Sequence, residues 1–143
     1  MSREHTTLRF ASSCTEATIC AAEELNDPAH YVPAWNYNPQ DGRGLKNPAT
    51  QAQAMDELVA VVNKLTPDNF TPTIITQTSD YLYVEYESPT FGFIDDVEFY
   101  FKGDVCEYRS ASRIGESDGN ANRKRIAAIR KELQKKGWES VGF

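Results

Sequence analysis

The chain has few of the residues and motifs that usually identify an enzyme or a membrane protein. It contains 143 residues but only two histidines, His5 and His30, and three cysteines. The phosphate-binding glycine loop and the His-Glu-x-x-His zinc motif are both absent, which disfavours the common nucleotide hydrolases and zinc proteases. No apolar run approaches the roughly 18–20 residues of a membrane-spanning helix. Residues 1–7 also lack the apolar core of a signal peptide. We therefore expect no transmembrane segment.

Basic side chains are concentrated in one segment of an otherwise acidic chain. The formal net charge is −6, which argues against specific nucleic-acid binding. Residues 123–136 nevertheless hold seven basic residues and one acid, whereas the remainder holds 20 acids and 8 bases. A basic helix here could contact an anionic membrane surface peripherally. It could equally be a solvated helix face that suits the negative end of the helix dipole.

The N-terminal third differs in pattern from the rest of the chain. Residues 1–47 have weak periodicity and many turn residues, which predicts an extended arm that wraps the domain, with a short helix at about residues 16–25. Its aromatic residues, including Trp35 and Tyr37, are expected to anchor it by burying ring area. Residues 48–143 then form a single α+β domain, and arm and domain make one compact unit.

The remaining elements follow from periodicity. A helix with an apolar stripe begins after Asn47, which we expect to be its N-cap with Pro48 in the first turn. It ends at residues 66–68. Four strands are predicted at residues 71–78, 81–88, 94–102 and 105–113, followed by a helix at residues 120–136. The predicted fold is therefore α+β: a four-stranded antiparallel meander with two helices packed on one face, preceded by the extended N-terminal arm.

The second hairpin allows a prediction of strand register. A two-residue turn at residues 103–104 places Glu98 directly opposite Arg109. The side chains then divide between two faces. The face expected to be the core carries Asp95, Val97, Phe99, Phe101, Cys106, Tyr108, Ser110 and Ser112. This face becomes polar near the loop before the last helix, where we expect a site, and Cys106 is expected to be a buried small hydrophobe.

Arginines, serines and the start of a helix meet at this polar end, which suits an anion. The same carboxylates and arginines could instead neutralise one another in a network that fixes the helix onto the sheet. The candidate site residues are Asp95, Asp96, Arg109, Ser110, Ser112, Arg113, Asp118, Asn122 and Arg123.

Several runs resemble the family catalogued as domain of unknown function 1499. They are Phe93-Ile-Asp-Asp-Val-Glu-Phe99, Arg109-Ser-Ala-Ser-Arg-Ile-Gly115, Ser117-Asp118, Asn122-Arg-Lys-Arg-Ile126, His30-Tyr-Val-Pro33 and the cysteines Cys14 and Cys20. The chain departs from the family pattern in lacking prolines between the two cysteines and in having Gly119-Asn120 after the aspartate. Pairing of the cysteines would require an oxidising compartment.

The resemblance implies no established reaction and no cofactor. Its members occur in bacteria, cyanobacteria and plastids, so it implies a photosynthetic organism as a setting. It implies a cytoplasmic or stromal location if the chain is complete, and the thylakoid lumen or periplasm if a targeting segment was removed.

Two functional hypotheses follow. The first is a non-enzymatic binding or assembly module that holds a partner protein or a small anionic ligand at the Arg/Asp loop, linked to photosynthetic or envelope membranes. The alternative is a small metal-assisted or acid/base hydrolase-like enzyme that uses Asp95, Asp96, Asp118 and Arg113. Neither hypothesis rests on a recognised catalytic, metal-binding or cofactor-binding motif.

Overall fold

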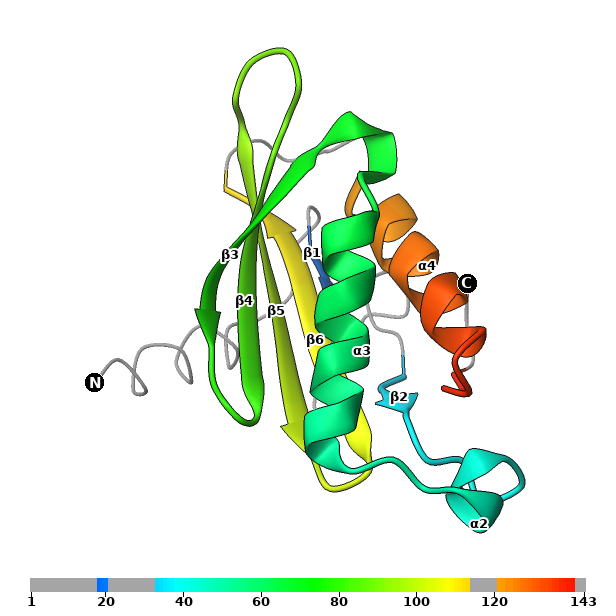
Figure 1. Ribbon diagram of the computed structural model, residues 1–143. Coiled ribbons are helices and arrows are strands. Elements are labelled where there is room, and N and C mark those ends of the chain that lie inside the picture. Colours follow the sequence, from blue (N-terminus) through cyan, green and yellow to red (C-terminus); the bar gives the residue numbers. More distant parts are fainter. Residues whose placement is uncertain (1–17, 21–32, 114–120, 141–143) are drawn as a thin grey trace.

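An antiparallel sheet forms the centre of the structure, a computed structural model that describes residues 18–20, 33–113 and 121–140 (Figure 1). Four of its strands form the predicted meander: β3 (Thr71–Gln77), β4 (Tyr81–Glu87), β5 (Ile94–Lys102) and β6 (Val105–Ser112). Neighbouring strands pair antiparallel throughout, with one register shift in β3 between Ile74 and Thr76. The α+β fold and the meander are therefore confirmed.

Two short strands extend the sheet beyond the predicted four. β1 (Thr18–Cys20) and β2 (Trp35–Asn36) both pair antiparallel with β6, on the edge away from β5. The strand at β1 corrects the helix expected at about residues 16–25, at least over its three described residues. Strands of two or three residues are too short to show alternation in a sequence, and pairing with β6 rather than local propensity defines them.

Both main helices, α3 (Gln51–Lys64) and α4 (Ala121–Gln134), lie on one face of the sheet (Figure 1). The predicted start of α3 was wrong: Thr50, not Asn47, is its N-cap. The Thr50 side chain accepts a hydrogen bond from the Gln53 backbone N–H, and the Gln53 side chain accepts one from Thr50 in return. This reciprocal capping box satisfies two backbone donors, which outweighs the helix-start preference of Pro48.

Two short helical turns complete the described elements. The four-residue α2 (Arg43–Lys46) precedes α3. The 3-10 turn η1 (Pro67–Asn69) follows α3, where the sequence predicted that the helix would end.

The core lies between the two helices and the sheet. Leu58 and Ile129 from the helices, and Val84 and Phe99 from the sheet, each have 0% exposed surface. Cys106 is buried on the same face, as predicted. Apolar alternation along β4 and β5 therefore identifies the core face correctly.

The aromatic side chains of residues 33–40 also join this core. Trp35 is buried and stacks on Tyr108 with ring centroids 4.2 Å apart. Tyr37 is buried too, and its hydroxyl donates to the backbone oxygen of Gly103 at 2.8 Å. These two residues hold the chain against the edge of β6, as expected of anchors. Tyr31 lies outside the described residues.

The face of the sheet turned away from the helices is unusual because it is both polar and buried. Tyr81, Tyr83, Asp96 and Glu98 all lie on it and are buried. A buried carboxylate is costly without a cationic or hydrogen-bonding partner. The polar groups on both faces therefore need partners, and these partners define the candidate site.

Candidate functional site

A fully buried arginine forms the centre of the polar cluster between α4 and the sheet. Arg125 of α4 has 0% exposed surface, and its guanidinium donates to Asp95 Oδ2 at 2.8 Å. A second nitrogen donates to Asn122 Oδ1 at 2.8 Å and to Ser110 Oγ at 3.0 Å. Asn122 also donates to Ser112 Oγ at 3.1 Å. We call Asp95, Ser110, Ser112, Asn122 and Arg125 the inner cluster.

Two aromatic rings enclose the inner cluster. The guanidinium carbon of Arg125 lies 4.8 Å from the centroid of the Phe70 ring and 4.6 Å from that of Tyr86. The Tyr86 hydroxyl is buried and has no hydrogen-bond partner among the described residues. Burial raises the pKa of Tyr86 to about 12, although the nearby charge of Arg125 acts to lower it. The arginine is thus held by ionic, polar and cation–π contacts at once.

A second arginine organises the opposite face. Arg113 donates through Nε to Asp96 Oδ2 at 2.9 Å and through Nη2 to Glu85 at 2.6 Å. The hydroxyl of Tyr83 contacts both Asp96 and Arg113. Hydrogen bonds to Asp96, helped by those to Tyr83 and Glu85, raise the pKa of Arg113, although burial acts to lower it. We call Tyr83, Glu85, Asp96 and Arg113 the outer cluster.

The pair predicted between neighbouring strands lies beside the outer cluster. Glu98 and Arg109 are opposite each other in the register, and their closest side-chain N and O atoms are 3.6 Å apart. The hydroxyl of Tyr81 donates to the same Glu98, which is completely buried. The predicted register of the second hairpin is therefore confirmed.

The sheet separates the predicted site residues into two groups rather than one loop site. Asp95 and Asp96 are adjacent in β5, so their side chains point to opposite faces. Asp95 lies with Ser110, Ser112 and Asn122 on the helix side. Asp96, Arg109 and Arg113 lie on the far side. Arg123 of α4 is half-buried and belongs to neither cluster, and Asp118 lies outside the described residues.

Sequence reasoning missed Arg125 as a site residue, although the pattern contained a signal. The apolar stripe of α4 consists of Ile126, Ile129 and Leu133. Counting back along the same face reaches Asn122 and Arg125 at core positions. An aspartate on the core face of β5 then offers the complementary charge. A buried ion pair between helix and sheet was therefore readable from these two coincident patterns.

A third polar contact joins the chain before α3 to the end of α4. Arg43 forms a two-pronged ion pair with Glu57, with N–O distances of 2.8 and 2.9 Å. It also donates to the backbone oxygens of Tyr37 and Lys136. Trp138 donates to Glu57 as well. Burial alone would raise the pKa of Glu57, but hydrogen bonds from Arg43 and Trp138 hold it below its ordinary value.

Gly137 is required by this third contact. Its φ of +106° is unfavourable for other residues. A Cβ at this position would lie 2.8 Å from the Cδ of Arg43. Arg43 therefore crosses the end of α4 only because the residue beneath it has no side chain.

The described residues show neither a metal-binding cluster nor a membrane-spanning helix. Among residues 18–20, 33–113 and 121–140, no group of three or more His, Cys, Asp and Glu side chains is placed to hold a metal ion. No described helix is long and apolar enough to cross a membrane.

Residues 115–119 read Gly-Glu-Ser-Asp-Gly, which has the letters of the Gly-x-Ser-x-Gly motif. This run lies outside the described residues, as do both histidines and Cys14.

The fold and the two clusters together define a class of protein. It is a two-layer α+β protein whose described carboxylates in the clusters are engaged by arginines and tyrosines. Residues 11–133 match the family described as Protein of unknown function (DUF1499), and the chain belongs to this family. Comparisons with curated proteins and with solved structures found no match.

Proposed function

We propose that the protein is a non-enzymatic binding module that holds a partner protein at the outer cluster. The observation that supports this proposal is the way in which the Arg113 side chain is exposed and held. Its side chain is 45% exposed, yet Nε and Nη2 are fixed by Asp96 and Glu85. No described residue accepts a hydrogen bond from its remaining nitrogen, Nη1. A rigid, half-exposed guanidinium loses little freedom on binding, which favours a role as an interface anchor.

The charges around Arg113 favour a protein partner over a free anion. Among the described residues, two carboxylates, those of Glu85 and Asp96, lie against the single guanidinium of Arg113. A small anion would be repelled by these two carboxylates at close range. A backbone carbonyl or a side-chain amide on a protein surface is a neutral acceptor and avoids this repulsion. Arginine is also among the residues that are enriched in protein interfaces.

The hydrolase alternative has less support from the geometry. It uses Asp95 or Asp96 together with Asp118, which lies outside the described residues. Asp95 and Asp96 themselves lie on opposite faces of the sheet. Each is already paired, Asp95 with Arg125 and Asp96 with Arg113. Because each carboxylate already accepts hydrogen bonds from an arginine, neither is placed to exchange a proton with a substrate.

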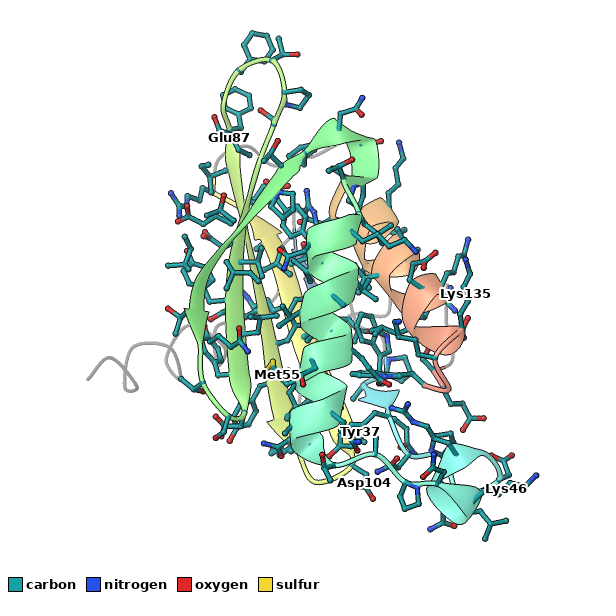
Figure 2. The ribbon with its side chains drawn as sticks, viewed as in Figure 1. Tyr37, Lys46, Met55, Glu87, Asp104 and Lys135 are labelled. Atoms are coloured by element: carbon teal, nitrogen blue, oxygen red, sulfur yellow. The ribbon has the colours of Figure 1, made fainter. Side chains whose placement is uncertain are left out.

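Native mass spectrometry of the protein purified from its own host tests the proposal. We expect the wild type to carry a protein partner with fixed stoichiometry, and the Arg113→Ala and Arg113→Lys variants to lose it. Lysine keeps the charge but not the two-pronged geometry. Lys46→Ala is a matched control. Lys46 is an exposed cation, and it lies at the opposite end of the molecule from Glu87 (Figure 2).

The fold of each variant is checked by circular dichroism and thermal unfolding before the comparison. A partner retained by folded Arg113 variants, or a bare chain in the wild type, would contradict the proposal. A bound small molecule lost in the variants would replace the partner protein with a ligand.

A further inference from the structure

The loop between β4 and β5 displays two aromatic side chains away from the body of the protein. This loop, residues 88–93, projects beyond the neighbouring strand ends (Figure 1), with Glu87 at its base (Figure 2). Phe91 is 75% exposed and Phe93 is 49% exposed. Their rings stack on each other with centroids 5.4 Å apart. The pair forms a small apolar tip, which we call the Phe tip.

The Phe tip is held in place rather than being a loose loop. The backbone N–H of Ser88 donates to the carbonyl of Phe93 at 2.8 Å, and the N–H of Phe93 donates to Ser88 Oγ at 2.9 Å. Gly92 adopts a φ of +68°, which other residues rarely adopt. The rings are therefore presented in a defined position, at the cost of exposing apolar area to water.

The loop also contains no charged residue. Its six residues are Ser-Pro-Thr-Phe-Gly-Phe, whereas 25% of the whole chain is charged. The acidic residue nearest in sequence, Glu87, is exposed at the base of the loop. The carboxylate of Glu87 lies beside Gly92, where a Cβ would be 3.3 Å from its Oε2. An uncharged loop with a charged residue at its base matches the change from apolar to polar surroundings across a membrane interface.

The area of the Phe tip argues against a second protein as its main occupant. A phenylalanine buries about 150–250 Å² at most, and a specific protein interface needs about 1,000 Å². Two rings on a narrow convex loop fall well short, and a tip-to-tip contact between two copies would fall short for the same reason. A bilayer needs no complementary shape and receives each inserted ring individually.

We propose that the Phe tip inserts Phe91 and Phe93 into the interfacial region of a lipid bilayer and so holds the protein at a membrane surface. The contact is driven by apolar burial, because Glu85, Glu87 and Asp96 near the loop base outnumber Arg113. This inference goes beyond the proposed function and does not depend on it, because it rests on Phe91 and Phe93 and is measured with vesicles in the absence of a partner protein.

Co-sedimentation with phosphatidylcholine vesicles tests this proposal. The double variant Phe91→Ser/Phe93→Ser is expected to reduce partitioning at least about tenfold, since each ring loses its transfer into the interface. Leu45→Ser is the matched control: Leu45 is 72% exposed but lies in α2, away from the loop, and its removal is expected to leave partitioning unchanged. Raising the salt concentration from 50 to 500 mM is expected to change wild-type binding less than about threefold.

A fluorescent variant gives an independent measurement. Phe91→Trp is expected to show a blue-shifted emission component with vesicles and quenching by brominated lipid. Trp35 and Trp138 are buried and supply a constant background.

Absence of vesicle binding, or equal binding by the double variant, would overturn the proposal. Binding that requires anionic lipid and falls steeply with salt would also overturn it and would point to basic α4. Loss of vesicle binding in the Phe variants with the Arg113-dependent partner retained would separate this proposal from the one above.

Discussion

The inner and outer clusters use the same chemistry in opposite surroundings. Each contains an arginine paired with one of two adjacent aspartates of β5, Asp95 or Asp96. Arg125 of the inner cluster is completely buried, whereas the side chain of Arg113 in the outer cluster is 45% exposed. The alternation of a strand is sufficient to send neighbouring carboxylates to these two environments. One pair is therefore enclosed by the fold, and the other remains within reach of a partner.

This difference determines what each pair contributes to stability. A buried ion pair gains little over an apolar replacement, but removal of one partner leaves an uncompensated charge in the core. In the outer pair water reaches Arg113 but not the buried Asp96, so the pair is screened from one side only and contributes less than the inner pair. The comparison predicts that equivalent substitutions in the two clusters have very different effects on unfolding.

The largest effect is expected from Arg125→Met. This substitution preserves much of the side-chain volume but strands the carboxylate of Asp95 beneath α4. We expect the free energy of unfolding to fall by about 3–5 kcal/mol, measured by urea denaturation at pH 7. Lys124→Met is the matched control, because Lys124 is the preceding residue, is 58% exposed in its side chain and lies 3.7 Å from Asp68. Its effect should stay within about 0.5 kcal/mol.

A second substitution shows whether the loss of stability comes from the lost attraction between Arg125 and Asp95 or from the buried, unpaired charge left on Asp95. If the stranded charge is the cause, Arg125→Met combined with Asp95→Asn should recover part of the loss. A single-variant loss below about 1 kcal/mol would show that Asp95 and Arg125 are not coupled in the way the geometry indicates.

The next effect concerns the aromatic wall of the inner cluster and appears at high pH. The pKa of Tyr86 is about 12 in the folded protein, compared with an ordinary value of 10.0. The neutral phenol is therefore favoured by folding: its contribution is complete below pH 10 and is lost as the pH rises from 10 to 12. The difference corresponds to about 2–3 kcal/mol. Tyr86→Phe should lack this loss, so urea midpoints of the two proteins should diverge above pH 10 in favour of the variant.

At neutral pH the same variant tests the hydroxyl itself. Because no described residue accepts or donates a hydrogen bond there, Tyr86→Phe should be neutral or stabilising by up to about 1 kcal/mol. A destabilisation above about 1 kcal/mol at pH 7 would show that the hydroxyl is hydrogen-bonded in solution.

The sequence predicted those parts of the fold that depend on local pattern. Strand alternation and the turn at residues 103–104 were sufficient to place Glu98 opposite Arg109. Counting alone also placed Asp95 with Ser112 on the core face. The sequence did not predict β1 and β2. Their two or three residues are defined by hydrogen bonds to β6 rather than by their own composition.

The candidate site was predicted less completely because it depends on how layers meet. The sequence grouped Arg109 and Arg113 with Asn122 as one loop site, but the sheet lies between them. It assigned no role to Arg125, since a basic residue in a basic run suggests solvent. Its place on the apolar face of α4 was the overlooked signal, and the contact with Asp95 shows that this one cation is withdrawn into the core. Arg43 was missed because its partner Glu57 is brought close by the tertiary fold.

The outer cluster supplies the counterpart to Arg125. Arg113→Ala should lower the free energy of unfolding by about 1–2 kcal/mol, less than Arg125→Met, because Asp96 is buried but still accepts a hydrogen bond from Tyr83. Urea denaturation at pH 7 gives the comparison directly. A loss as large as that of Arg125→Met would remove the distinction between the two clusters and make Arg113 a structural residue rather than an interface anchor.

The smallest effect is expected at Glu57, which extends the comparison to the contact between Arg43 and the end of α4. Its pKa lies below the ordinary value of 4.5 in the folded protein. The stability it contributes is therefore complete above pH 4.5 and is lost as the pH falls through the lower, folded-state pKa. Glu57→Gln keeps an acceptor for Trp138 but removes the charge opposite Arg43, so it should cost less than about 1 kcal/mol at pH 7. Thermal unfolding from pH 7 to pH 3 should show the wild type and the variant converging at the acid end. A difference that stays constant across this range would mean that the charge on Glu57 is not what holds Arg43 across the end of the helix.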